Sequence, residues 1–63
     1  MKLRELRDII IDRVRIVRDF DELYSGMMSD TPDDILNCEI DWVSSDVVWR
    51  GADWIVVTGI RVK

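Results

Sequence analysis

The side chains of this sequence that could do chemistry are a single cysteine, one tyrosine, a few serines and thirteen carboxylates. Histidine, the commonest general base near neutral pH, is absent. Ser44, Ser45, Tyr24 and Cys38 have no base at a spacing that would activate a nucleophile, and no Gly-x-Ser-x-Gly motif occurs. We therefore predict that the protein is not an enzyme and has no catalytic residues.

The sequence also lacks the residue patterns that form metal and cofactor sites. Cys38 is the only cysteine, so the chain can form neither an internal disulfide nor a Cys/His zinc site. The carboxylates of Asp33 and Asp34, and of residues 19–22, lack the spacing of a calcium loop, and helix capping and turn formation account for them. Phosphate loops need clustered glycines, but the glycines here are scattered at Gly26, Gly51 and Gly59. We predict no metal and no cofactor.

The charges are unevenly distributed along the chain, although the net charge is only −4. Residues 1–18 carry six basic and three acidic side chains, residues 19–49 carry nine acidic and no basic ones, and residues 50–63 carry three basic and one acidic. The acidic middle could pair with the basic ends, or it could imitate a nucleic-acid backbone on a partner's surface. A pI near 4.5 argues against direct nucleic-acid binding. The candidate partner-binding residues are Asp33, Asp34, Glu39, Asp41, Arg13 and Arg15.

Hydrophobic periodicity predicts an α+β fold in a single domain, residues 1–63. Leu3, Leu6, Ile9 and Ile10 recur at helical spacing, which predicts a helix over about residues 2–11. A period of two at residues 13–18 predicts a strand, and residues 23–28 predict its hairpin partner, with Gly26 at a bulge or a close approach. Thr31 followed by Pro32 predicts the cap and first residue of a helix of one or two turns that stops near Asn37.

The C-terminal half is predicted to be β-structure. Residues 39–43 alternate, residues 47–49 resume the pattern, and residues 54–62 form an Ile/Val-rich strand after a turn at residues 51–53. The predicted architecture is thus a short N-terminal helix packed on an antiparallel sheet of four to five strands, with a second short helix.

The last strand is apolar on both sides. Trp54, Val56, Ile60 and Val62 would lie on one side, and Ile55 and Val57 on the other, so the second side needs a cover. The N-terminal helix or a second copy of the chain could provide it. Three tryptophans are also difficult to bury in 63 residues. We therefore predict a homodimer whose self-association residues are Trp54, Ile55, Val57 and Trp49.

The layout resembles that of very small proteins encoded in phages and prophages of Gram-positive bacteria. The resemblance lies in the opening Met1-Lys2-Leu3-Arg4-Glu5-Leu6, the arginine-rich strand, the hairpin, the Thr31-Pro32-Asp33-Asp34 helix start and the terminal Ile/Val-rich strand. Some proteins of this kind, such as the Hachiman anti-defence proteins, act against bacterial defence systems.

The resemblance implies a non-enzymatic inhibitor that binds a host protein complex, such as a nucleic-acid-handling enzyme. Two alternatives stay open: a general protein-interaction or transcription-linked regulatory module, and a sponge for a small nucleotide messenger. A charged N-terminus and the lack of a long apolar run predict a cytoplasmic protein that does not contact membranes.

Overall fold

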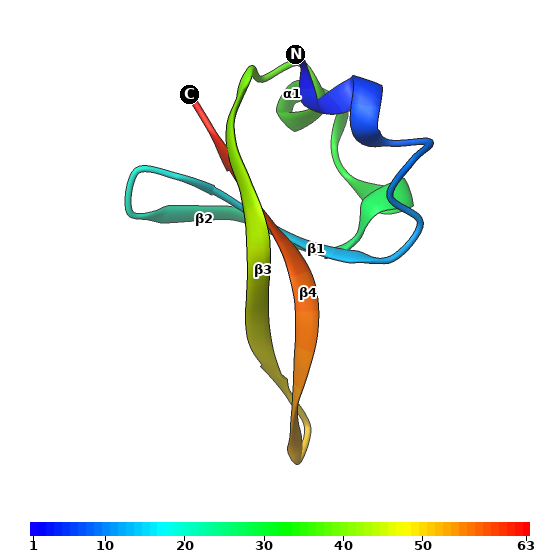
Figure 1. Ribbon diagram of the computed structural model, residues 1–63, viewed down its shortest axis with the longest axis vertical. Coiled ribbons are helices and arrows are strands. Elements are labelled where there is room, and N and C mark those ends of the chain that lie inside the picture. The colour runs from blue at the N-terminus through cyan, green and yellow to red at the C-terminus, as the bar shows by residue number, and fades with distance from the viewer.

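The computed structural model describes all residues, 1–63, and places four strands in one sheet with the order β2-β1-β4-β3. The strands are β1 (Arg13–Arg18), β2 (Asp21–Met27), β3 (Ile40–Arg50) and β4 (Asp53–Val62). The helical segments are the 3₁₀ turns η1 (Leu3–Leu6) and η2 (Met28–Asp30) and the single-turn helix α1 (Asp33–Leu36). These short segments gather at the end of the molecule opposite the tip of the β3–β4 hairpin (Figure 1).

The predicted fold class is wrong, because sheet makes up 57% of the chain and helix only 17%. The expected helix over residues 2–11 is limited to η1, a 3₁₀ turn of four residues. Backbone bonds to the chain before β3 hold this segment: Leu3 N donates to Cys38 O, and Ile40 N donates to Met1 O. A short isolated helix has a costly nucleus, so these long-range bonds override the local periodicity, and Ile9 is left exposed.

The sheet is also mixed rather than antiparallel. β1 and β2 pair antiparallel, as do β3 and β4, but β1 and β4 run parallel, with Val14 opposite Thr58 and Ile16 opposite Ile60. Two hairpins are thereby joined along their inner strands. The last strand in the sequence lies inside the sheet, between β1 and β3.

The local predictions for residues 13–37 are confirmed in part. The hairpin of residues 13–27 is present, but its bulge lies between Ile16 and Val17 and not at Gly26. Gly26 instead marks a close approach, because a Cβ there would lie 2.8 Å from the Tyr24 hydroxyl oxygen. Thr31 does not cap α1: its hydroxyl is buried and donates to Met28 O, and Pro32 occupies the cap position.

The core lies on one face of the sheet, under the helical segments. Its buried side chains come from β1, β4 and all three helical segments: Leu3, Val14, Ile16, Met28, Leu36, Ile60 and Val62. The opposite face of the sheet, which we call the outer face, carries none of them. The core therefore lies only where β1 and β2 join the sheet, which is the upper part of the molecule in Figure 1, where β1 and β2 cross β3 and β4.

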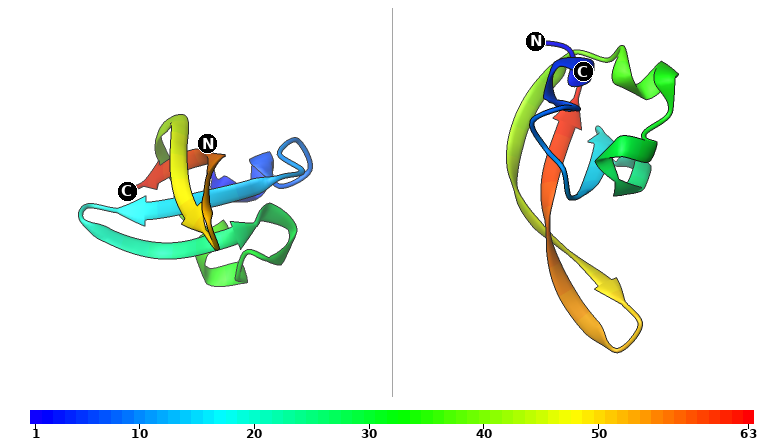
Figure 2. Two further views of the ribbon diagram at one scale, coloured as in Figure 1. Left: turned by 90° about the horizontal axis from the view of Figure 1, so that it is seen from below. Right: turned by 90° about the vertical axis from the view of Figure 1, so that its right-hand side faces the viewer.

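The β3–β4 hairpin extends past this core as a twisted two-stranded ribbon (Figure 2). β1 pairs with β4 only from Thr58 to Arg61, so residues 45–57 have no third strand beside them. We call residues 45–57 the arm. Its turn has Gly51 at φ 60°, while Ala52 has an ordinary negative φ, which is the pattern of a type II′ hairpin turn.

Candidate functional site

Trp42 lies on the outer face because of a register irregularity in β3. Regular alternation would put Ile40 and Trp42 on one side of the strand. In the ladder, however, Ile40 pairs with Val62 and Trp42 pairs with Arg61, so Asp41 is an extra residue between them. Such a bulge re-aims the next side chain, and bulges are common beside functional sites. The indole of Trp42 is 59% exposed.

The bulge is tied to β4 by an ion pair. Arg61 Nε donates to Asp41 Oδ2 at 3.1 Å. The same arginine is the register partner of Trp42, so it lies beside the indole on the outer face. One bulge thus places an aromatic ring and a paired guanidinium next to one another.

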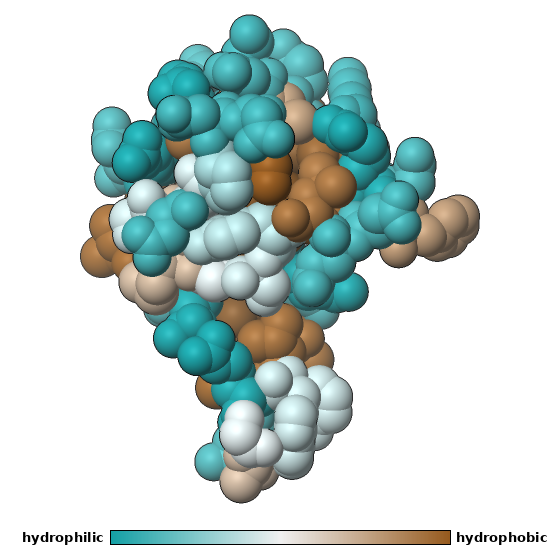
Figure 3. All heavy atoms as spheres, turned by 180° about the vertical axis from the view of Figure 1, so that it is seen from behind, coloured by the Kyte–Doolittle hydropathy of each residue, from teal (hydrophilic) through white to brown (hydrophobic).

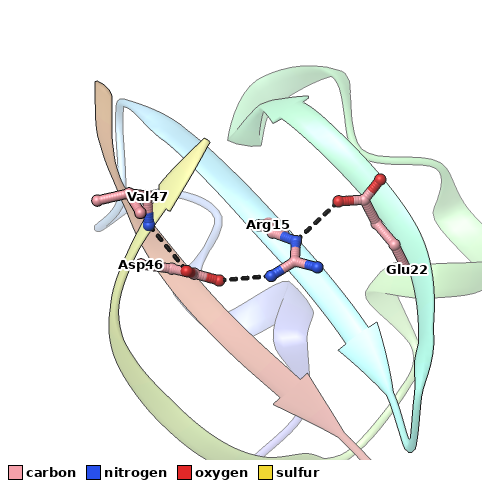
Figure 4. Close-up of polar contacts among 4 residues, drawn as sticks. All are labelled: Arg15, Glu22, Asp46 and Val47. Carbon is pink, nitrogen blue, oxygen red and sulfur yellow. Dashed lines mark hydrogen bonds and ion pairs between the residues drawn. The ribbon is translucent and has the colours of Figure 1, made fainter. Parts of the chain in front are cut away.

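A second guanidinium, that of Arg15, is held between two carboxylates on this face. Arg15 Nε donates to Glu22 Oε1 at 2.8 Å, and Arg15 Nη1 donates to Asp46 Oδ2 at 2.8 Å (Figure 4). The three residues come from β1, β2 and β3, so the bridge crosses the sheet from one edge strand to the other.

Gly59 makes this bridge possible. It is the register partner of both Arg15 and Ser44, so it lies on β4 beneath the path from Arg15 to Asp46. A Cβ at this position would lie 3.1 Å from the Asp46 Cβ and 3.4 Å from the Ser44 carbonyl oxygen. A glycine inside a strand often marks such a close approach. In the sequence, the only trace of this close approach is a glycine within the predicted strand of residues 54–62.

The bridge shifts the titration of its members in the directions expected for opposite charges. Hydrogen bonds from Arg15 and from the Val47 backbone hold the pKa of Asp46 below its ordinary value. Hydrogen bonds to Asp46 and Glu22 raise the pKa of Arg15. All the partners are partly exposed, so each pair contributes about 0.2–1 kcal/mol and mainly fixes side-chain positions.

These side chains border a shallow hollow on the outer face. It has a volume of about 170 Å³ and is lined by Arg15, Val17, Trp42, Ser44, Asp46, Gly59, Ile60 and Arg61. Pockets for drug-sized ligands usually measure about 300–1,000 Å³. The hollow is therefore suited to a single protruding side chain and not to a nucleotide.

The predicted partner-binding residues do not form one surface. Asp33 and Asp34 lie on α1, Asp33 at 4.0 Å from Arg4, and Glu39 accepts from the N-terminal ammonium at 3.2 Å. Asp41 and Arg15 lie near the outer hollow, bonded to Arg61 and to Asp46 and Glu22. Arg13 is half-buried on β1.

The acidic middle is thus paired largely with the basic ends. Four side-chain ion pairs join acids of residues 19–49 to arginines outside that block: Arg4–Asp33, Arg15–Glu22, Arg15–Asp46 and Arg61–Asp41. The remaining acids are split between the β1–β2 turn and the η2–α1 segment, which lie apart in Figure 1. A single acidic surface resembling a nucleic-acid backbone is not formed.

The predicted self-association residues are divided between the two faces of the arm. Trp49 and Trp54 are register partners and share the face that continues the core side, where both are exposed. Ile55 and Val57 alternate to the outer face, where Val57 is buried. Only the two tryptophans therefore belong to an open apolar surface.

Comparison of the chain with protein-family models, curated proteins and solved structures found no match. No group of three or more His, Cys, Asp or Glu side chains is placed to hold a metal ion. None of the helices has the length and apolar character required to span a bilayer.

Proposed function

We propose that this protein is a non-enzymatic binding protein that meets a partner protein through the outer face, with Trp42 as its anchor. The observation that carries the proposal is the bulge at Asp41, which turns an exposed indole onto the outer face, beside the ion pairs of Arg15 and Arg61. Trp and Arg are the residues most enriched among those that dominate binding energy at protein interfaces.

The arginines of this face support a protein partner over a phosphate-bearing one. Arg15 and Arg61 both border the hollow, but each is already bonded to a carboxylate. A phosphate would have to displace those carboxylates, and the hollow is small for a nucleotide. The nucleotide-sponge alternative therefore has no supporting site on this face.

A preorganised face also reduces the cost of binding. Immobilising a long side chain at an interface costs about 0.5–1.5 kcal/mol, and Arg15 is already held at both ends of its guanidinium. The rim of paired charges around Trp42 fits the usual anatomy of an interface, in which a central anchor is surrounded by polar groups. From the layout resemblance, we further propose that the partner belongs to a bacterial defence complex and is inhibited by this binding.

The proposal is tested by co-expressing the chain with a panel of bacterial defence systems and counting phage plaques. We expect the wild-type chain to restore plaque formation against at least one system, and Trp42→Ala to abolish that effect. Phe20→Ala is the matched control, because Phe20 is a fully exposed aromatic residue in the β1–β2 turn. If no system is inhibited, the defence role is wrong; if Trp42→Ala inhibits as well as the wild type, the outer face is not the binding surface.

A further inference from the structure

The arm presents a face that carries no charge. Residues directly opposite one another on antiparallel strands share a face, so the Val47–Val56 and Trp49–Trp54 pairs lie together on the side that continues the core face. We call these four residues the arm face. The charged residues of the arm all alternate to the other side: Asp46, Arg50 and Asp53.

The arm face is also the most exposed apolar region of the sheet. Its four side chains are between 51% and 74% exposed. In Figure 3, brown apolar residues lie on the hairpin next to the pale residues of its tip, while most of the hydrophilic residues gather above. A two-stranded hairpin is at best marginally stable in water without something packed on it, and all four residues of the arm face are left exposed by the rest of this chain.

The surface shape of the arm face indicates which kind of partner could cover it. Trp49 and Trp54 form a T-shaped pair with ring centroids 5.2 Å apart, which makes a bulky ridge near the tip. Beside it lies a hollow of about 290 Å³ lined by Ser45, Asp46, Val47 and Val56. The ridge thus lies next to a hollow whose apolar wall, Val47 and Val56, belongs to the arm face, and whose Asp46 wall belongs to the outer face.

We infer that a second copy of this chain packs on the arm face, with the two arms antiparallel about a two-fold axis. This arrangement places the tryptophan ridge of each protomer over the valine row and hollow of its partner. A two-fold interface requires a self-complementary patch, and facing sheets pack best when large side chains meet small ones. The four residues of the arm face carry no charge, and the one carboxylate that borders the hollow, that of Asp46, is paired with Arg15. Two chains of net charge −4 can therefore approach with little like-charge repulsion in the contact.

The area is sufficient for a small dimer. Two indoles exposed by 55% and 66% offer about 200–300 Å² per protomer, and the valines add a similar amount. Complete burial of these side chains in both protomers would remove up to about 1,000 Å² from water, which is near the lower bound for a specific interface. The dimer is therefore expected to be reversible at micromolar concentrations and insensitive to salt.

Contact through faces is favoured over pairing of the free β3 edges. In a two-residue hairpin the closing pair, Arg50 and Asp53, is hydrogen-bonded, so alternation turns the N–H of Val47 toward the free edge. That N–H donates to Asp46 Oδ1 at 2.8 Å. Charged groups at an edge strand discourage strand addition, and here the carboxylate also occupies the donor.

The experiment is sedimentation velocity of the wild-type chain, Val56→Lys and Ile11→Lys over a range of concentrations. Ile11 is the matched control, because it is an exposed apolar residue outside the sheet. We expect the wild type and Ile11→Lys to approach twice the 7.4 kDa chain mass at high micromolar concentration. Burying an unpaired lysine should raise the dissociation constant of Val56→Lys at least about 30-fold.

Val47→Lys gives an independent arm of the test, because it places the charge on the other strand of the same row. Far-UV circular dichroism at low concentration checks that each variant is folded. The inference is overturned if the wild type stays at 7.4 kDa, if either folded lysine variant dimerises like the wild type, or if Ile11→Lys dissociates equally. It does not depend on the proposed function, because Trp42 lies on the opposite face; a monomeric chain whose Trp42→Ala variant loses inhibition would overturn the dimer alone.

Discussion

The two faces of the β3–β4 hairpin are built from alternate residues of the same two strands and are stabilised by different forces. The outer face holds Asp46 in a bridge with Arg15 and Glu22, and its contacts are directional and short. The arm face holds two apolar pairs with no polar partner and wide exposure. Strand alternation alone separates the two, because neighbouring residues point to opposite sides.

The two faces differ in what their contacts can contribute to binding. Ion pairs on the outer face contribute little energy each, but they fix where side chains stand before a partner arrives. Burial of the arm face would contribute a binding free energy of about 25 cal/mol per Å², and this contribution does not depend on the orientation of the groups in contact. One face is therefore suited to specific recognition and the other to assembly.

The largest effect is expected from filling the space that the outer-face bridge requires. Gly59→Leu would place a side chain against Asp46 Cβ and beneath the Arg15 guanidinium, so we expect it to destabilise the fold by about 2–3 kcal/mol. Thr58→Leu, one residue away on the opposite face, should change stability by less than about 1 kcal/mol. Urea denaturation of both variants provides the measurement, and equal stability of Gly59→Leu and wild type would contradict the role assigned to Gly59.

On the arm face, a double-mutant cycle on Trp49→Ala and Trp54→Ala measures the aromatic pair. Measured at concentrations where the chain is monomeric, each single variant should lose about 1–2 kcal/mol of stability, with a coupling energy of about 0.5–1.5 kcal/mol. Additive losses would show that the two rings stabilise the arm independently.

A smaller and pH-dependent effect is expected at Asp46. Because its pKa is lowered in the folded protein, its contribution is complete above the unfolded pKa, near 3.9, and is lost as pH falls through the folded pKa. Asp46→Asn should therefore cost about 0.5–1 kcal/mol at pH 7, and this difference should vanish once the pH falls below the lowered pKa of Asp46 in the folded protein. Asp53→Asn, which removes a carboxylate without an ion pair, is the control in the same urea titrations.

The smallest effect on stability is expected at the proposed anchor. Trp42 is largely exposed and is not part of the core cluster, so Trp42→Ala should change the free energy of unfolding by less than about 0.5 kcal/mol. In thermal denaturation, Trp42→Ala should therefore be more stable than the Trp49 and Trp54 variants, although it loses partner binding. A large loss of stability would assign Trp42 a structural role instead.

Local pattern predicted much of the sheet. Alternation placed residues 13–18 and 54–62 in strands and divided Trp54 and Val56 from Ile55 and Val57 correctly, because one side chain per two residues is a property of the strand itself. The same reasoning failed for residues 2–11, where contacts with Cys38 and Ile40, more than thirty positions away, decide the conformation.

The candidate site could be predicted less well than the fold. The bulge at Asp41 turns Trp42 to the outer face, but residues 39–43 alternate regularly in the sequence and so do not predict a bulge. The bridge of Arg15 to Asp46 depends on the parallel pairing of β1 with β4, which brings together residues distant in sequence. Only Gly59 could have been identified from the sequence, because a glycine within an apolar strand indicates a close approach of another group to the backbone.

The parallel seam between β1 and β4 also governs how the chain reaches its structure. Each hairpin is local and can form within about 1–10 μs, but Val14 must find Thr58 across the intervening chain before the core closes. We therefore expect closure of this seam to be the slow step of folding. Substitutions at Ile16 or Ile60 should slow folding, whereas substitutions in the arm should leave the folding rate nearly unchanged and speed unfolding.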